Sequence, residues 1–372
     1  MPFNPPILYT PEVQTFDGDE QQTVSELNET FDIILNKTAA DYGHAVRSVH
    51  AKAHGILEGT MTVKGGLPPE LAQGLFANPG AYKTYMRIST NAGDILPDDI
   101  SLPRGLALKV VEVTGARLPD AEGATQDFVM VNGPVFQAKN AKKFLSSLKI
   151  LAKTTDRMEG TKEVLSNVLQ GVNATLQAAG LSSPTVQSMG GAPDVDPLGE
   201  TYYSVTPFRY GDYIAKFSIR PVSKDLTELT GKEIDTKDQP DAIRETVQGE
   251  MRHLSGEWEF CVQLCRDLEK QPVEDPTVQW DEDEAPFVAV ATIYAVPQDS
   301  WSKTNVQKVD EEMRFSVWTG LAAHEPLGNI NRARKATYEH SAKFRAGFNR
   351  CPIHEPASVS YTHLTLPTKR IV

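Results

Sequence analysis

The chain has 372 residues, of which 40% are hydrophobic and 23% are charged, and these proportions are ordinary for a folded globular protein. Its net charge is −12, and no run of lysine or arginine stands out. A surface for nucleic acid or for anionic lipid needs clustered cations, so neither partner and no membrane anchoring is expected. The length suits either two ordinary domains or one large barrel.

The chain ends and the cysteines bear on location. Residues 1–13 lack the basic and apolar regions of a signal peptide, and no stretch of 18 apolar residues predicts a membrane-spanning helix. Three cysteines without zinc spacing favour reduced thiols and a cytoplasmic protein. Residues 357–372 resemble a translated cloning adapter, and we expect them to be a non-native tail.

The first predicted elements are a proline-rich arm and a helix within residues 1–40, followed by many strands. Alternating or β-branched segments separated by turn residues predict these strands. The predicted strands are 45–64, 83–90, 104–114, 127–136, 203–209, 213–222, 257–265 and 286–296. So many strands in one chain favour a barrel or a sandwich.

Two further stretches have helical periodicity. Residues 138–180 predict two helices with a break between 154 and 160, and residues 327–349 predict one helix with Asn329 or Asn331 as its N-cap. The proline- and glycine-rich residues 181–200 predict a surface loop. We therefore expect one main unit over 41–352, with a helical insertion near 138–180.

The last predicted helix carries a stripe of chemical interest. Arg334 and Tyr338 are four residues apart and Arg345 is eleven from Arg334, so the three share one face. A guanidinium beside a phenol favours the phenolate, which is a suitable ligand for ferric iron. The second arginine could bind a carboxylate. The alternative is a solvated, salt-bridged helix with one aromatic side chain packed inward.

A histidine lies in the first predicted strand. Side chains alternate along a strand, so Arg47 and Val49 are expected to face one way while Ser48 and His50 face the other. A lone histidine among apolar residues is more often a packed core residue than a catalytic one. A catalytic role for His50 therefore needs companions elsewhere in the chain.

Two other segments offer such companions. Asn132 lies in a turn, Val131-Asn132-Gly133-Pro134, that can present its amide to a pocket. Arg87 and Ser89 share one face of the strand 83–90. Burying Arg87 would be costly unless an anionic group paired with it.

These segments, in this order, resemble the catalase superfamily, and the chain is most similar in kind to its small catalase-related haem proteins. The resemblance covers residues 45–345. The segments that carry it are Arg47–Lys52, Tyr85–Thr90, Arg104–Lys109, Asp127–Phe136, Pro272–Ala291, His324–Gly328 and Arg334–Tyr338, with Arg345 seven residues later.

The resemblance implies an α+β fold, an antiparallel β-barrel that binds haem b between flanking helices. It implies that Tyr338 ligates the iron and that His50, Asn132 and Ser89 are catalytic. The remaining cofactor-binding residues that it implies are Arg47, Val49, Arg87, Arg334 and Arg345. A homo-oligomer is also possible on this resemblance.

The expected function is a haem-dependent hydroperoxidase whose substrate is a small peroxide, either hydrogen peroxide or an organic hydroperoxide used with a peroxidase donor. We expect the chain to lack the wrapping segment and C-terminal domain of long catalases, and Gln137 stands where they commonly have phenylalanine. The alternatives are an allene oxide synthase-like rearrangement of fatty-acid hydroperoxides, a non-catalytic haem-binding or storage protein, and a β-rich binding protein without haem. Val49 favours peroxide consumption over rearrangement.

Overall fold

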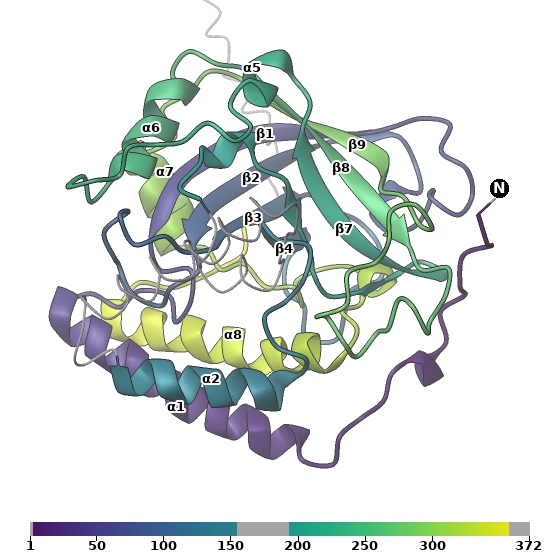
Figure 1. Ribbon diagram of the computed structural model, residues 1–372, viewed down its shortest axis with the longest axis horizontal. Helices are drawn as coiled ribbons and strands as arrows, with labels where there is room; N and C mark the ends of the chain where they lie inside the picture. The colour runs from purple at the N-terminus through teal and green to yellow at the C-terminus, as the bar shows by residue number, and fades with distance from the viewer. Residues whose placement is uncertain (1–2, 155–192, 357–372) are drawn as a thin grey trace, which may run out of the picture.

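A closed antiparallel β-barrel forms the centre of the molecule in a computed structural model, which describes residues 3–154 and 193–356 (Figure 1). Eight strands follow one another around the ring in the order β5-β4-β3-β2-β1-β9-β8-β7. Pairing of Tyr202 with Ile219 joins β5 to β7 and closes the ring. The strands are β1 (Ala53–Val63), β2 (Gly80–Thr90), β3 (Arg104–Val111), β4 (Thr125–Val131), β5 (Tyr202–Tyr203), β7 (Tyr213–Pro221), β8 (Gly256–Leu264) and β9 (Val288–Ala295), with β6 (Phe208–Tyr210) paired to β7.

Aromatic side chains fill the barrel, because every second residue of a strand points inward. The ring of Phe128 lies 4.7 Å from that of Phe260 and 5.1 Å from that of Phe217, measured between centroids. Phe76 stacks on Phe260 at 5.1 Å. Burying one such side chain stabilises the fold by roughly 1.5–3 kcal/mol, so this cluster is a main source of the barrel's stability.

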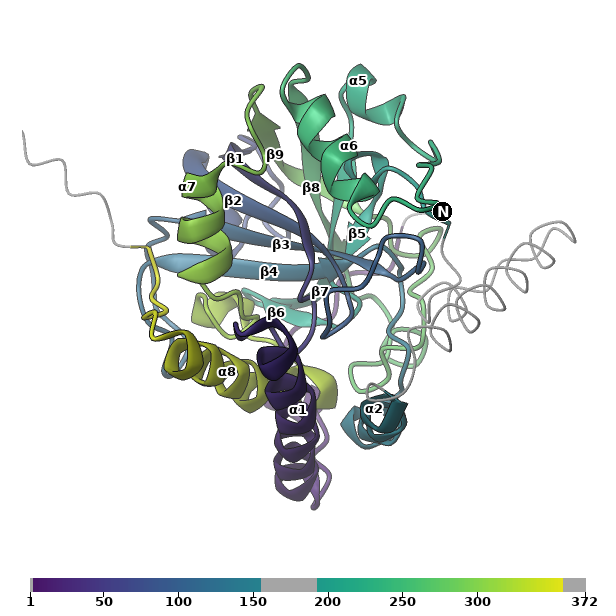
Figure 2. The ribbon, with the colours of Figure 1, turned by 90° about the vertical axis from the view of Figure 1, so that its left-hand side faces the viewer.

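Three long helices pack together on one side of the barrel, below it in Figures 1 and 2. They are α1 (Glu20–Tyr42), α2 (Ala141–Thr154) and α8 (Asn329–Asn349). Their apolar faces meet in a second buried cluster that includes Leu27, Phe31, Leu145 and Ile330. The shorter helices α5 (Lys224–Thr227) and α6 (Ala242–Met251) lie on the other side, and α7 (Lys303–Asn305) lies on the flank of the barrel (Figure 2). This arrangement holds α8 beside strands β2, β3 and β4 of the barrel.

The start of α8 differs from the prediction. Gly328 precedes the helix with a left-handed φ of 85°, and Asn329 is already the first helical residue. The side-chain oxygen of Asn329 accepts a hydrogen bond from the Ala141 N–H at 2.7 Å, so it caps α2 instead. Asn331 lies buried inside α8, and Glu274 accepts the hydrogen bond from the Asn329 N–H.

The predicted antiparallel barrel with flanking helices is confirmed, and most predicted strands agree within a few residues. The strand prediction is wrong for residues 45–52, which form irregular coil and bends before β1. The loop prediction is wrong for residues 195–199, which are buried. The short helix α6 was not predicted. Residues 155–180, 181–192 and 357–372 of the sequence predictions lie outside the described residues.

Two features of the described residues bear on the protein's surroundings. None of the helices there is long and apolar enough to cross a membrane. Cys261, Cys265 and Cys351 are free thiols, and the first two are buried.

Replacing Phe260 by alanine should lower the free energy of unfolding by about 3–5 kcal/mol, because the change leaves a cavity among the barrel's aromatic rings. Denaturant unfolding followed by circular dichroism measures this. Val288→Ala is a matched control, since Val288 is 40% exposed on β9, and it should cost less than about 0.5 kcal/mol. A loss below about 1 kcal/mol for Phe260→Ala would show that these rings do not form the main core.

Candidate functional site

A cavity lies between strands β2, β3 and β4 of the barrel and α8, and its empty volume is about 610 Å³ when its opening to solvent is included. Side chains from the loop before β1, from β2, from β3 and β4, and from α8 line it. The cavity brings together these residues that the sequence singled out: Arg47, Val49, His50, Arg87, Ser89, Tyr338 and Arg345. Segments nearly 300 residues apart in the chain therefore meet in one place.

The loop that carries His50 has a strained backbone. His50 has a φ of 54°, a conformation that is uncommon for residues other than glycine. Its N–H donates to the Asn91 carbonyl at 3.2 Å, and the Ser48 N–H donates to the Ser341 hydroxyl of α8 at 3.1 Å. These bonds hold the loop in place. Strain of this kind costs about 1–3 kcal/mol and is typical of functional sites.

This conformation corrects the alternation predicted for residues 47–50. Because the segment is not a strand, its side chains do not divide between two faces. Arg47, Ser48, Val49 and His50 all line the same cavity.

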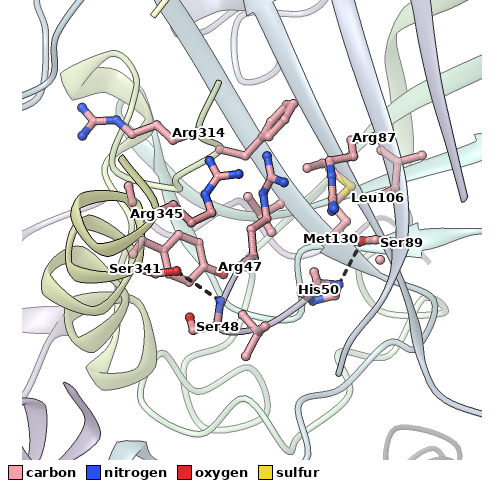
Figure 3. A pocket seen from close by; sticks show the side chains of 17 residues that line it. Arg47, Ser48, His50, Arg87, Ser89, Leu106, Met130, Arg314, Ser341 and Arg345 are labelled. Carbon is pink, nitrogen blue, oxygen red and sulfur yellow. Dashed lines mark hydrogen bonds between the residues drawn. The ribbon is translucent and has the colours of Figure 1, made fainter. Parts of the chain in front are cut away.

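The imidazole ring of His50 is held from two sides. Its Nδ1 lies 3.2 Å from the Ser89 hydroxyl, as the dashed line in Figure 3 shows. A Cβ at Gly105 would lie 2.4 Å from Cε1 of the ring, so a residue with a side chain does not fit there while the ring stays in place. Burial lowers the pKa of His50 to about 3, and the positive charges of Arg87, Arg334 and Arg47 contribute. The ring is therefore neutral at neutral pH.

On α8, the face toward the cavity carries Tyr338, Ser341 and Arg345. The Arg334 guanidinium lies 5.9 Å from the centre of the Tyr338 ring, and its Nη1 donates to the Asn331 side-chain oxygen at 3.2 Å. Within residues 3–154 and 193–356, no group hydrogen-bonds to the Tyr338 phenol oxygen. The phenol is thus available to a ligand, with a cation beside it.

Three arginines gather along one wall of the cavity, and we call Arg47, Arg87 and Arg345 the arginine cluster (Figure 3). One carboxylate, that of Asp310 in the π-helical segment Val306–Glu311, pairs with two of them. Asp310 Oδ1 accepts from Arg87 Nε at 2.8 Å and also from Arg47 Nη1. Arg345 Nη1 donates to the Asp310 backbone carbonyl at 2.8 Å.

The arginine cluster and Asp310 together carry two positive charges in excess. Burial and then repulsion from Arg345 and Arg87 hold the pKa of Arg47 well below its usual range. Burial also lowers the pKa of Arg345. Burial alone would raise the pKa of Asp310, but Arg87 and Arg47 outweigh it and hold that pKa below its ordinary value. An anion in the cavity would relieve this repulsion.

The structure does not place Asn132 in the cavity. Its side-chain oxygen accepts from the Arg104 N–H at 3.0 Å, and its amide nitrogen donates to Glu200 at 2.8 Å. Glu200 also pairs with the Arg104 side chain. The chain does bend at 132–134, but the amide of Asn132 binds Glu200, 68 residues away, instead of facing the cavity.

Sequence reasoning missed Ser341 and Asp310. Ser341 lies seven residues after Arg334 and three after Tyr338, so the helical stripe could have predicted it. Asp310 sits in the charged run Val309-Asp310-Glu311-Glu312, which reads as a solvated segment. Nothing in that pattern distinguishes the one carboxylate that is buried against the arginine cluster.

The imidazole of His50 should stay neutral as the pH falls from 8 to 5, because its pKa is lowered to about 3. Between pH 6.5 and 3 the unfolded chain binds a proton at this residue and the folded chain does not. His50 therefore contributes a loss of stability as the pH falls through that range. Nitrogen NMR of labelled histidine measures the ring directly, and a titration midpoint near 6.5 would contradict this burial.

Comparison with known proteins bears on the fold. No protein-family model and no curated protein sequence matches the chain. Solved catalase structures do match. A fungal catalase has a TM-score of 0.59 at 16% identity, covering 88% of this chain and 68% of its own. Catalase A from Saccharomyces cerevisiae gives 0.58 at 18%, covering 86% and 66%, and a bacterial catalase gives 0.57 at 14%, covering 92% and 66%. The chain has the fold of these catalases and spans about two thirds of their length.

Proposed function

We propose that this protein is a haem-dependent hydroperoxidase, acting on hydrogen peroxide or on organic hydroperoxides with a peroxidase donor. One observation carries the proposal. A single cavity is lined by an available phenol on α8, a buried neutral imidazole on a strained loop, and three arginines with an excess of two positive charges. Each of these features is costly to keep in a fold that makes no use of it.

The residues present fit haem b. The porphyrin is a flat apolar ring whose two propionates carry two negative charges on one edge. The excess charge of the arginine cluster equals that of the propionates, and arginine binds carboxylates with paired hydrogen bonds. Leu106, Val129 and Met130 give the cavity apolar walls.

Tyr338 would hold the iron through its phenolate oxygen. The Arg334 guanidinium lies beside the ring, and Asn331 fixes the position of that guanidinium. When bound, ferric haem supplies the redox chemistry that cleaves the peroxide O–O bond.

His50 would move the proton. A neutral imidazole accepts a proton from the peroxide hydroxyl at one nitrogen and returns it to the leaving oxygen, which departs as water or an alcohol. If Nδ1–H donates to Ser89, Nε2 is left as the accepting nitrogen. Asn132 is not needed for this step, since its amide is bonded to Arg104 and Glu200.

The strain at His50 favours an enzyme over a storage protein. A storage site needs Tyr338 and the arginine cluster. It gains nothing from a histidine whose backbone is in the left-handed region and whose ring is held between Ser89 and Gly105. Proton transfer does need a ring held in one orientation.

Tyr338→Phe should abolish stable binding of ferric haem, because the change removes the oxygen that holds the iron and leaves the rest of the cavity in place. Titration of the chain with haem, followed by the absorption spectrum, tests this. Tyr294→Phe is the matched control, since Tyr294 is 46% exposed on β9, and it should bind haem like the wild type. A normal ferric spectrum from Tyr338→Phe would contradict the assignment.

His50→Ala should keep haem and lose about 10²–10⁴-fold in peroxide turnover, the usual contribution of a positioned acid–base group. The measurement is the rate of hydrogen peroxide or tert-butyl hydroperoxide consumption per bound haem. His253→Ala, at an exposed histidine, is the control and should leave the rate unchanged. An undiminished rate in His50→Ala would remove this residue from the proposed mechanism.

A further inference from the structure

Asp310 is placed as if it were a ligand of the arginine cluster. Its carboxylate is 15% exposed and pairs with Arg47 and Arg87 through a single oxygen, Oδ1. These are the side chains that would bind the propionates of a porphyrin. The chain therefore supplies one carboxylate of its own to a site that would take two from the ligand.

The segment that carries Asp310 is fastened by the same arginines. Arg345 donates to the backbone carbonyls of Asp310 and Met313 at 2.8 and 3.0 Å. Arg47 Nη2 donates to the Met313 carbonyl at 3.2 Å. Val309 is fully buried against β1 and β2, so the segment cannot move away easily. The Asp310 charge is thus a fixed part of the cavity wall.

The arginine cluster also has hydrogen-bonding capacity to spare. A guanidinium has five N–H hydrogens, and Arg87 uses two of them, on Asp310 and on the Ala51 carbonyl. Arg345 likewise uses two. A ligand carboxylate can therefore bind while Asp310 stays in place. Asp310 affects such a ligand mainly through its charge.

We propose that Asp310 is a resident counter-ion that limits how tightly the cavity holds a dicarboxylate porphyrin. This inference rests on the proposed function, since it concerns the same site. Without a ligand, Asp310 stabilises the fold, because it lowers the net charge of the arginine cluster from three to two. The same negative charge repels the ligand's carboxylates once they enter. Stability without ligand is gained at the expense of affinity.

The test is Asp310→Asn, compared with the wild type by titration with metal-free protoporphyrin IX and with ferric haem. The variant should bind both at least about tenfold more tightly, because one negative charge within a few ångströms of the carboxylates is removed in a partly buried site. Without porphyrin it should melt at a lower temperature than the wild type. Both readouts are independent of catalytic activity.

Glu311→Gln is the matched control. It removes the same charge one residue away, but Glu311 pairs with His44 at 2.9 Å and makes no hydrogen bond to the arginine cluster among the described residues. Its charge acts on Arg47 and Arg345 less strongly than that of Asp310 does. Its effect on porphyrin affinity should be much smaller than that of Asp310→Asn. Protoporphyrin dimethyl ester is the matched ligand, and it should show no gain in affinity because it lacks the carboxylates.

A second pair of variants keeps the test decisive if Asp310→Asn does not fold. Adding Asp310→Asn to Arg47→Gln raises the net charge from one to two, which the wild-type fold already tolerates. This double variant should bind porphyrin more tightly than Arg47→Gln alone. Equal or weaker binding in both comparisons overturns the inference while the proposed function stands. If the wild type binds neither haem nor protoporphyrin, the proposed function fails and the inference fails with it.

Discussion

The rest of the site depends on three closely packed guanidinium groups, two of which share the carboxylate of Asp310. Arg47 comes from the loop before β1, Arg87 from β2 and Arg345 from α8, so the arginine cluster exists only when barrel, loop and helix are packed together. Two of its charges remain uncompensated by protein groups in contact with it, which destabilises the fold unless an anion is bound. The proposed binding of a ligand of opposite charge would recover this stability.

The arginine cluster also acts on His50, the proposed acid–base group. Arg87 and Arg47 are among the charges that lower the pKa of His50, after the larger effect of burial. The positive charges that would bind a dianionic cofactor therefore help to keep the imidazole neutral and able to accept a proton. Ser341 links the two sides of the cavity, because it lies on the same face of α8 as Tyr338 and bonds to the loop that carries His50.

Local patterns in the sequence predicted the barrel well. In strands such as β2, β3 and β8, apolar and polar residues alternate, and this alternation is visible within a few residues of sequence. They also predicted that Tyr338 and Arg345 share one helix face and that Arg87 and Ser89 share one strand face, because regular helix and strand geometry determines these positions. The failures fall where geometry depends on distant contacts. The loop at 47–50 looks like a strand, yet its bonds to Asn91 and Ser341 hold His50 in a left-handed conformation. Asn132 is turned away by Glu200, and Asp310 is buried by arginines from three other segments. Both effects come from contacts between residues that are far apart in the sequence, so a short stretch of sequence cannot predict them.

The most direct test is a crystal structure of the chain prepared with ferric haem. The proposed account predicts one haem in the cavity, with iron bonded to the Tyr338 oxygen and both propionates on Arg47, Arg87 and Arg345. It further predicts His50 on the face of the porphyrin opposite to Tyr338, with its ring still bonded to Ser89. Haem bound elsewhere, or held in the cavity by a residue other than Tyr338, would contradict the account.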